Sequence, residues 1–350
     1  MSLVKVAVVI LNFNGKYYLE KFLPDIVRNS FPHQVIVADN GSTDNSISFL
    51  KENFQQVRLI ENGGNYGYAE GYNRALENID AEYFILLNSD VEVSENWIEP
   101  VISLMEKNPL IAACQPKILD HAHQTTFEYA GASGGFIDKY GYPFCRGRIF
   151  NVLEKDSGQY DTKAEIFWAS GACLFVKSKA FWEVGGFDND YFAHMEEIDL
   201  CWRLKNIGYK IYVEPASVIY HIGGGTLNKL SKRKTFLNFR NNLITYTKNS
   251  SPEFLFWKII FRMILDGVAA FKFLVEGQPK HFFAVLRAHY YYYIWLGKTL
   301  AKRRSMQAKH GFSYASTEIY QANIVTEHFL KHKKKFSDLE KAFAELKSKN

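Results

Sequence analysis

Asn88-Ser89-Asp90 come directly after the apolar, strand-favouring run at residues 83–87. In open α/β sheets, ligands bind at the carboxyl ends of the strands, where loops emerge from the rigid core. A carboxylate in that place can hold a divalent metal ion against a substrate phosphate. The alternative is a strand followed by an ordinary Asp-containing turn, which is common in α/β proteins. The motifs elsewhere in the chain decide between the two.

A second acidic group consists of Glu196, Glu197 and Asp199, in a stretch that is predicted to be helical. On a helix, Asp199 can pair with Arg203, while Glu196 and Glu197 point in different directions. A solvated helix face is the usual explanation for such charges, but the adjoining Gly171 loop favours a pocket wall. Two carboxylate clusters suit a transfer reaction, in which one holds a metal and the leaving group and the other deprotonates an acceptor.

His221 is a third candidate, because it ends a predicted strand at 218–221 and precedes a glycine-rich loop. A lone histidine is usually structural. At a strand end, before glycines that allow close backbone approach, it is a better candidate for a ligand.

The elements that must position these residues alternate regularly. Strands are predicted at 4–11, 34–38, 57–60 and 83–87, and helices at 17–29, up to about 53 and at 71–78, with Ser42 or Thr43 capping the second helix. This order predicts a doubly wound α/β domain with a mainly parallel sheet, whose polar loops gather on one edge where a nucleotide would bind. No Gly-x-Gly-x-x-Gly follows the first strand and no Walker lysine appears, which argues against a Rossmann dehydrogenase or a P-loop protein.

The later elements are less regular. Helices are predicted at 97–106, 179–184, 195–204 and 235–246, and a strand at 172–176. The stretch at 112–170 mixes short apolar pieces with glycines and aromatic residues, which favours antiparallel strands and loops.

Length and cysteine usage bound the class of protein. A chain of 350 residues can form one large domain with an extension, or two domains. The four cysteines show no paired spacing, so neither a zinc site nor a disulfide framework is predicted. No signal peptide is recognised, and we expect a reducing, cytoplasmic compartment.

The net charge of +5 hides an asymmetry between the two ends of the chain. Residues 230–350 carry 22 Lys and Arg against 8 Asp and Glu, a net of +14, which leaves −9 for residues 1–229. Such a basic tail could meet nucleic acid, an anionic membrane surface or an acidic substrate. Nucleic acid is disfavoured because no recognition module is visible.

The tail contains two unusual stretches. Residues 254–275 are strongly apolar, but four charged residues interrupt them, so a membrane span is not expected and the spacing gives no clean single stripe. Tyr290-Tyr291-Tyr292-Tyr293-Ile294-Trp295 stands beside four basic residues, namely Lys298, Lys302, Arg303 and Arg304. That combination suits a membrane interface as well as it suits a packed helical extension with a solvated basic face. Residues 331–350 are predicted to form a solvent-exposed helix or a frayed terminus.

Taken in order, these motifs resemble the inverting family 2 glycosyltransferases with the GT-A fold, and most of all their bacterial rhamnosyltransferase-like branch. The motifs are Asn12-Phe13-Asn14, Asp39-Asn40-Gly41-Ser42-Thr43-Asp44, Asn65-Tyr66-Gly67, Gly71-Tyr72-Asn73-Arg74, Asn88-Ser89-Asp90, Ser170-Gly171-Ala172, Glu196-Glu197-Ile198-Asp199 and His221. The resemblance covers about residues 4–245. It implies an α/β catalytic domain at 1–245, with a mixed, mainly parallel sheet flanked by helices, and a basic, aromatic-rich helical extension at 246–350.

The resemblance also assigns roles to residues. The nucleotide and donor sugar would be held by Leu11, Phe13, Asp39, Asn40, Asn65, Gly67, Asn73, Arg74, Asn88 and Ser89. Mg²⁺ or Mn²⁺ would be bound by Asp90 and His221, since the first Asp of the family's Asp-x-Asp motif is Asn88 here. The acceptor side would be formed by Trp168, Ser170, Gly171 and Asp199. Glu197 matches the catalytic base, although the choice between Glu197 and Glu196 stays open.

The function implied is metal-dependent, inverting transfer of a sugar from a nucleotide diphosphate sugar to a hydroxyl of a cell-surface glycan or lipid-linked acceptor. Rhamnose is the leading donor sugar, and the basic tail suggests peripheral contact with the inner face of the cytoplasmic membrane. One alternative is a sugar-nucleotide-forming nucleotidyltransferase, which would need a Gly-rich loop with Arg and Lys after the first strand. The other is a non-catalytic sugar-nucleotide-binding module, which Asn88 favours but Asp90, Glu197 and His221 oppose. The oligomeric state stays open.

Overall fold

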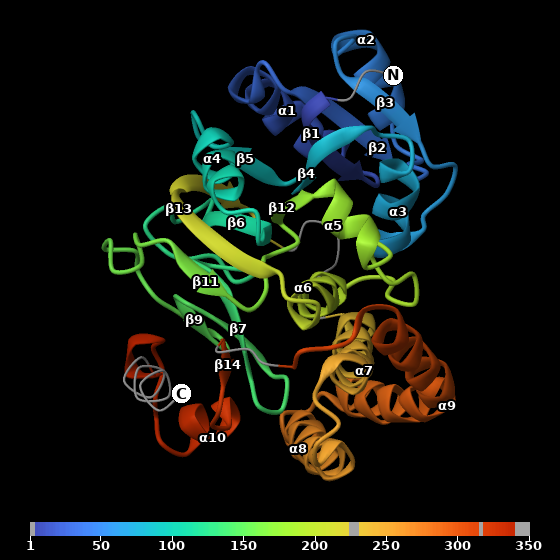
Figure 1. The fold of residues 1–350 in the computed structure, drawn as a ribbon, viewed down its shortest axis with the longest axis vertical. Coiled ribbons are helices and arrows are strands. Elements are labelled where there is room, and N and C mark those ends of the chain that lie inside the picture. The colour runs from blue at the N-terminus through green and yellow to red at the C-terminus, as the bar shows by residue number, and fades with distance from the viewer. Residues whose placement is uncertain (1–3, 224–230, 315–317, 340–350) are drawn as a thin grey trace.

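A nine-stranded mixed sheet forms the centre of the protein, for which a computed structural model describes residues 4–223, 231–314 and 318–339 (Figure 1). In spatial order its strands are β11 (Ala164–Ile166), β13 (Lys210–His221), β6 (Ile111–Asp120), β12 (Cys173–Lys177), β4 (Ala81–Asn88), β1 (Val4–Asn12), β2 (Gln34–Asp39) and β3 (Arg58–Glu61), with β5 (Val91–Val93) paired to β13. The pairings make β1, β2, β3, β4, β6 and β13 run in one direction, so the sheet is mainly parallel, as predicted.

Helices cover both faces of this sheet, because its strands are apolar on both sides. In β1, Val6, Val8 and Ile10 join one core cluster and Ala7 and Val9 the other, as the alternation of side chains in a strand requires. The first cluster packs against α1 (Lys16–Ser30), α2 (Ser46–Asn53) and α4 (Glu99–Lys107). The second packs against α3 (Gly67–Leu76), α5 (Ser178–Glu183) and α6 (Glu196–Asn206).

The carboxyl ends of the parallel strands gather at one edge of the sheet. In register, β1 ends at Asn12 beside Asp39 of β2, and Leu11 lies beside Asn88 of β4. Further along the sheet, His221 of β13 pairs with Asp120 of β6. Loops carrying nearly all of the predicted chemistry therefore leave the sheet at the same edge.

The stretch expected to hold short antiparallel pieces differs in part. Residues 111–120 instead form the long strand β6, which pairs in parallel with β13. The antiparallel strands that follow, β7 (Gly135–Asp138), β8 (Pro143–Cys145), β9 (Arg148–Ile149) and β10 (Val152–Leu153), build a second sheet. Its fifth strand, β14 (Ile319–Tyr320), comes from the far end of the chain.

The C-terminal part is helical and packs beneath the sheet in Figure 1. It contains α7 (Lys232–Asn249), α8 (Leu255–Val275), α9 (Pro279–His310) and α10 (Ile324–Phe329). The expected domain boundary at residue 245 falls inside α7, and β14 from the C-terminal part joins the second sheet. The division into two domains stays a prediction. No helix in the described part of the chain is long and apolar enough to cross a membrane.

Two local expectations are wrong. Ser42 and Thr43 do not cap α2, which begins at Ser46; they bond instead to Asn14 in the first loop. Of the 331–350 stretch the structure describes 331–339, which are mostly exposed, with 337–339 helical and Phe336 buried against the second sheet. Residues 340–350 lie outside the described part of the chain, so the expectation for this stretch stays a prediction. Residues 254–275 do form an apolar stripe, because their charged residues fall mostly on other faces of α8.

Candidate functional site

The two predicted metal ligands meet at the sheet edge. Asp90 stands in the turn between β4 and β5, and His221 ends β13, to which β5 is paired through Val91. His221 Nε2 lies 3.2 Å from Asp90 Oδ1, and the amide of Ile222 donates to the Asp90 carbonyl at 3.1 Å. Both side chains are buried. The pairing of β5 with β13 therefore brings together two motifs that are far apart in the sequence.

A third residue, Glu128, completes this cluster and was not predicted. Its Oε2 lies 3.3 Å from His221 Nδ1, on the opposite side of the imidazole from Asp90, and it is 3% exposed. Gly223, with a φ of 70°, passes so close that a Cβ there would stand 2.6 Å from Glu128 Oε1. The predicted need for glycine after His221 is thus met at Gly223, while residues 224–226 lie outside the described part of the chain. No sequence motif marks Glu128.

The two carboxylates make the imidazole strongly basic. Burial alone would lower the pKa of His221, but its contacts with Asp90 and Glu128, and their charges, outweigh burial and raise it to about 10. The position between the carboxylates of Asp90 and Glu128 therefore stabilises a positive charge. Carboxylate oxygen and imidazole nitrogen are also ligands that divalent metals accept.

The second carboxylate cluster stands at the beginning of α6. Glu196 is 5% exposed, whereas Glu197 keeps part of its surface accessible. Each has an Oε2 atom that is buried without a hydrogen-bond partner. Just before them, His194 and Met195 adopt left-handed backbone conformations, with φ of 71° and 75°. Such conformations are costly for non-glycine residues and are often found at functional sites.

This environment raises the proton affinity of both glutamates. Burial, then the charge of Glu197, raise the pKa of Glu196 well above its ordinary value. Burial also raises the pKa of Glu197 to about 7, although backbone amides at the start of α6 act in the opposite direction. A partly accessible carboxylate with a pKa near neutrality can exchange protons with a substrate hydroxyl.

α7 holds the strained turn in place. The side-chain amide of Asn241 donates to the carbonyls of Ala193 and His194 at 3.0 and 2.8 Å. Arg240 in turn donates to Asn241 Oδ1 at 2.9 and 2.7 Å. Asn241 is fully buried. The packing of α7 on this turn therefore fixes the backbone that leads into Glu196 and Glu197.

The predicted acceptor loop lies between the two carboxylate clusters. The amide of Asn88 donates to the Ala172 carbonyl at 3.0 Å, and the Tyr68 hydroxyl donates to the Gly171 carbonyl at 2.7 Å. A Cβ on Gly171 would contact Glu197 Cβ at 3.8 Å. Ser170 is buried and its hydroxyl accepts from the Ala172 amide. The loop thus links the end of β4 to the base candidate.

Two acceptor-side candidates are placed differently from expectation. Asp199 is fully buried, and its oxygens accept from Arg203 at 2.9 Å and from Asn249 at 2.7 Å. Trp168 is 3% exposed, with its indole N–H donating to the Phe136 carbonyl at 2.9 Å. Both side chains hold the scaffold together and have no surface left for an acceptor. The predicted Asp199–Arg203 pair is confirmed.

The donor loops are organised by two buried side chains. Asp39 Oδ1 accepts from the amides of Gly41 and Ser42, and its Oδ2 accepts from Asn12 Nδ2 at 3.0 Å. Asn40 donates to the Gly67 carbonyl at 2.9 Å. Asp39 and Asn40 are 1% and 2% exposed, so both shape the loops from within. Leu11, Phe13, Asn88 and Ser89 remain partly exposed at the same edge.

Gly67 fits its position for a steric reason. Its φ is 73°, and a Cβ there would stand 2.2 Å from the Phe192 carbonyl oxygen, which accepts from the Tyr68 amide at 2.7 Å. The loop before the acidic helix therefore rests directly on the start of α3. Asn65 is exposed, and its Oδ1 accepts from the Gly67 amide at 3.0 Å.

Asn73 and Arg74 point away from a common site. Asn73 donates to the Phe187 carbonyl and to Asn189 Oδ1, at 2.8 and 2.7 Å, and so joins α3 to the loop before α6. Arg74 is exposed and pairs with Glu70 at 2.7 Å. The structure gives Asn73 a scaffold position, and Arg74 reaches only its own helix and the Tyr66 ring.

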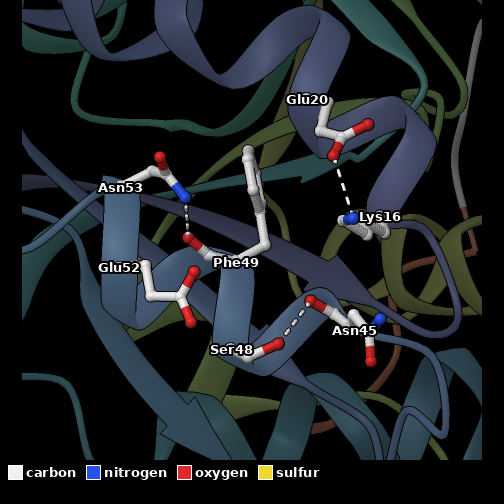
Figure 2. Close-up of a pocket in the computed structure, with 7 residues that line it drawn as sticks. All are labelled: Lys16, Glu20, Asn45, Ser48, Phe49, Glu52 and Asn53. Atoms are coloured by element: carbon white, nitrogen blue, oxygen red, sulfur yellow. Dashed lines mark hydrogen bonds and ion pairs between the residues drawn. The ribbon is translucent and has the colours of Figure 1, made fainter.

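A polar hollow of about 470 Å³ lies between α1 and α2 (Figure 2). It is lined by Lys16, Glu20, Asn45, Ser48, Phe49, Glu52 and Asn53. Lys16, its only cationic lining residue, pairs with Glu20 at 3.1 Å. None of the predicted site residues lines it. We therefore place the candidate site at the sheet edge instead.

At the sheet edge, Asp90 and His221 form a charged pair. The 170–172 loop links the end of β4 to α6, and Glu197 lies beside this loop. This arrangement can hold a cation at Asp90 and His221 that in turn contacts a substrate phosphate, and it can remove a proton from a second substrate at Glu197.

Comparison with known proteins decides the family. Residues 7–185, just over half of the chain, match the sequence profile of glycosyl transferase family 2. The chain belongs to that family. This family 2 glycosyltransferase is similar to the N-acetylglucosaminyl-diphospho-decaprenol L-rhamnosyltransferase of Mycobacterium tuberculosis, with 29% identity over 230 residues that cover 61% of this chain and 75% of the relative. It is also similar to the rhamnosyltransferase WbbL of Escherichia coli K12, with 24% identity over 225 residues that cover 62% of this chain and 83% of the relative.

Solved structures confirm the GT-A fold of this glycosyltransferase. GalNAc-T7 with UDP, GalNAc and Mn²⁺ superposes with a TM-score of 0.57 at 14% identity, over 88% of this chain and 58% of that one. The mannosyltransferase PcManGT of Pyrobaculum calidifontis, in complex with GDP-Man and Mn²⁺, gives 0.51 at 15% identity, over 88% and 85% of the two chains. At these identities the likeness concerns the fold alone.

The ligand set at Asp90 fits a divalent metal only in part. Within residues 4–223, 231–314 and 318–339, no three His, Cys, Asp or Glu side chains surround a common metal position. Asp90 and His221 can supply one oxygen and one nitrogen ligand, and a metal such as Mg²⁺ or Mn²⁺ is commonly completed by substrate phosphates. The residues present therefore suit a metal that arrives with a sugar nucleotide.

Proposed function

We propose that this glycosyltransferase carries out metal-dependent, inverting transfer of a sugar from a nucleotide diphosphate sugar to a hydroxyl acceptor. The observation that carries the proposal is the pair of carboxylate clusters at one sheet edge, with Asp90 against His221 and Glu197 against the Gly171 loop. A bound Mg²⁺ or Mn²⁺ would offset the charge of the departing diphosphate. Asp90 and His221 would hold it, and Asn88 and Ser89 would contribute hydrogen bonds.

Glu197 is the proposed general base. Its carboxylate would accept the proton of the acceptor hydroxyl, while the acceptor oxygen bonds to the anomeric carbon and the bond to the diphosphate breaks on the opposite face. Single displacement of this kind inverts the anomeric centre. Glu197 is preferred to Glu196 because it is partly accessible and lies beside Gly171, whereas Glu196 is buried.

Rhamnose carried on dTDP is the proposed donor, and a lipid-linked or cell-surface glycan the proposed acceptor. Support comes from the mycobacterial and E. coli relatives, both of which are rhamnosyltransferases. The name of the first relative specifies a diphospho-decaprenol acceptor. Peripheral contact of the basic C-terminal part with an anionic membrane would place the enzyme near such an acceptor.

A donor panel tests the proposal. The protein is incubated with UDP-, GDP- and dTDP-sugars, with Mg²⁺, Mn²⁺ or EDTA, and release of the nucleoside diphosphate is measured with and without a diphospho-prenol acceptor. We expect acceptor-stimulated release from dTDP-rhamnose that EDTA abolishes and that Asp90→Asn reduces strongly. Donor binding without release would favour the non-catalytic module. Pyrophosphate-dependent formation of a nucleoside triphosphate would favour the nucleotidyltransferase.

A further inference from the structure

The outer face of α8 carries an exposed apolar stripe. It consists of Trp257, Phe261, Ile264, Val268, Phe271 and Val275, which repeat at intervals of four and three residues and so share one side of the helix. Their exposed fractions run from 39% to 73%. Isolated apolar residues on a surface are ordinary, but a continuous stripe of this size marks an interaction surface.

The charged residues in the middle of α8 do not interrupt this stripe. Arg262 and Asp266 are 3% and 1% exposed and lie on the inner side of the helix. Arg262 donates to the Tyr140 carbonyl at 2.7 Å, while Asp266 accepts from the Tyr142 hydroxyl at 3.2 Å. These contacts fix which side of α8 faces the protein. The outer side is left with apolar groups alone at its centre.

α9 presents a second stripe next to the first. Phe283, Leu286, Tyr290 and Ile294 share one side of α9 and are 47% to 64% exposed. The hydroxyl of Tyr293 lies 3.3 Å from Met263 Sδ and so joins the two helices at this surface. Figure 1 places α8 and α9 at the end of the molecule opposite α2. We call the exposed apolar residues of the two helices the α8–α9 surface.

Basic residues surround the α8–α9 surface. The exposed charged residues of 254–300 are Lys272, Lys280, Arg287 and Lys298 against Glu276. Lys272 has a 62% exposed side chain beside the α8 stripe and pairs with Glu276 at 3.6 Å. Aromatic and aliphatic groups with a cationic rim are the composition of helices that lie in a membrane interface. A second copy of the chain would cover the apolar groups, but a symmetric contact would bring like-charged rims together.

We propose that the α8–α9 surface lies in the interfacial layer of a bilayer that contains anionic lipid, with α8 parallel to the membrane plane. The inference rests on the membrane contact in the proposed function and names its location. The sequence-based candidate combined the aromatic run at 290–295 with Lys298, Lys302, Arg303 and Arg304. The α8–α9 surface keeps Tyr290 and Ile294 of that run but excludes two of its basic residues, since Arg303 is buried and Lys302 pairs with Asp188 and Asp190 inside the protein.

The same ion pairs connect the α8–α9 surface to the candidate site. Lys298 of α9 pairs with Asp190 at 2.5 Å, and Lys302 pairs with Asp190 at 2.7 Å. Asp190 belongs to the loop that continues into Glu196 and Glu197, so α9 is tied by ion pairs to the loop that leads into the base candidate.

Vesicle sedimentation with the full chain tests the surface. The stripe variant is Ile264→Asp/Phe271→Asp, and the matched control is Phe31→Asp/Leu110→Asp, which alters two exposed apolar residues elsewhere (84% and 53% exposed) by the same charge. We expect the wild type and the control to sediment with phosphatidylcholine–phosphatidylglycerol vesicles. Binding of the stripe variant should fall about tenfold or more, because two apolar side chains no longer leave water. Equal binding of the two variants would overturn the proposal.

Trp257 gives a second, independent measurement. It is 66% exposed, so its fluorescence should shift to the blue on addition of vesicles, and Trp257→Phe should remove the shift while keeping the binding. Absence of any shift in the wild type would contradict insertion. Sedimentation velocity without lipid detects a self-associating surface: a dimer that the stripe variant dissociates would also overturn the proposal. Vesicle binding does not depend on turnover, so failure of donor hydrolysis would refute the proposed function and leave this result standing.

Discussion

His221 Nε2 lies 3.2 Å from Asp90 Oδ1, although the two residues are 131 positions apart in the chain. The contact exists because β5, directly after Asp90, pairs antiparallel with the last residues of β13. The candidate metal pair is therefore a product of sheet topology. Glu197 approaches the same edge from another direction, carried on a helix that follows a strained turn. Four substitutions or conditions test how these parts work.

Glu197→Gln should lower turnover by about 10²- to 10⁴-fold and leave donor binding unchanged, because a glutamine keeps the shape of the side chain but cannot accept the acceptor proton. Steady-state kinetics and donor titration measure the two effects. Glu196→Gln, which alters the buried neighbour instead, should lower turnover much less. Full transferase activity in Glu197→Gln would rule that residue out as the base, and a larger loss in Glu196→Gln would exchange the two roles.

Raising the pH should increase turnover and decrease stability at the same time. Burial raises the pKa of both Glu196 and Glu197 above the ordinary 4.5. Above pH 4.5 the folded protein therefore binds more protons than the unfolded one, and its free energy of unfolding falls as the pH rises. The stability that the two protonated carboxyl groups contribute at low pH is lost as the pH rises through about 7, where Glu197 ionises and can act as a base.

Thermal melting of wild type and Glu196→Gln at pH 5 and pH 8 measures the stability part. One pKa unit corresponds to about 1.4 kcal/mol, so we expect the variant to gain on the order of 1 kcal/mol at pH 8 and little at pH 5. A gain that is the same at both pH values would show that the glutamates titrate normally.

The parallel half of the fold could be predicted because its strands are buried on both faces and end in polar turns. β1, β2 and β4 appear at the expected places, and their loops meet at one edge. Antiparallel strands were expected within 112–170, and β7 to β10 confirm them. Their assembly into a sheet with β14 could not be predicted, since β9 and β10 are two residues long each and β14 comes from the opposite end of the chain. Periodicity cannot reveal pairs that only tertiary structure creates.

Some candidate site residues stand in places that a sequence pattern marks, and others do not. Asp90, His221 and Glu197 stand at the ends of regular elements, where sequence patterns are informative. Glu128 lies in irregular chain and gains its importance only through His221. Asp199 was expected on the acceptor side, but a helical spacing does not tell which acidic side chain will face buried partners such as Asn249. The α8 stripe was missed because Arg262 and Asp266 were counted without knowing which side they occupy.

Asn241→Ala should reduce turnover about tenfold with a smaller change in donor KM. The buried Asn241 amide holds the carbonyls of Ala193 and His194, so its removal frees a strained turn and misplaces Glu197. Asn238→Ala, an exposed position on the same helix, is the control and should behave as the wild type. A variant that loses stability but keeps its turnover at low temperature would limit Asn241 to a structural role.

Glu128→Gln should weaken metal binding by about 10- to 100-fold, since a carboxylate behind a ligating imidazole orients the ring and raises its basicity. Glu128 is placed for that role, at 3.3 Å from His221 Nδ1 on the side opposite Asp90. Mn²⁺ titration of the full chain in the presence of a nucleoside diphosphate, followed by electron paramagnetic resonance, measures the affinity directly.

The matched control is Glu92→Gln, because Glu92 Oε2 also pairs with a histidine, His121 Nε2, at 3.1 Å but has no contact with His221 among the described interactions. It should leave Mn²⁺ affinity unchanged. If Glu128→Gln binds Mn²⁺ as the wild type does, Glu128 only neutralises the buried imidazolium. In that case the variant should be less stable than the wild type without metal, which a thermal melt in EDTA detects. Reduced affinity together with an unchanged melt in EDTA identifies Glu128 as a positioning residue for the metal ligand.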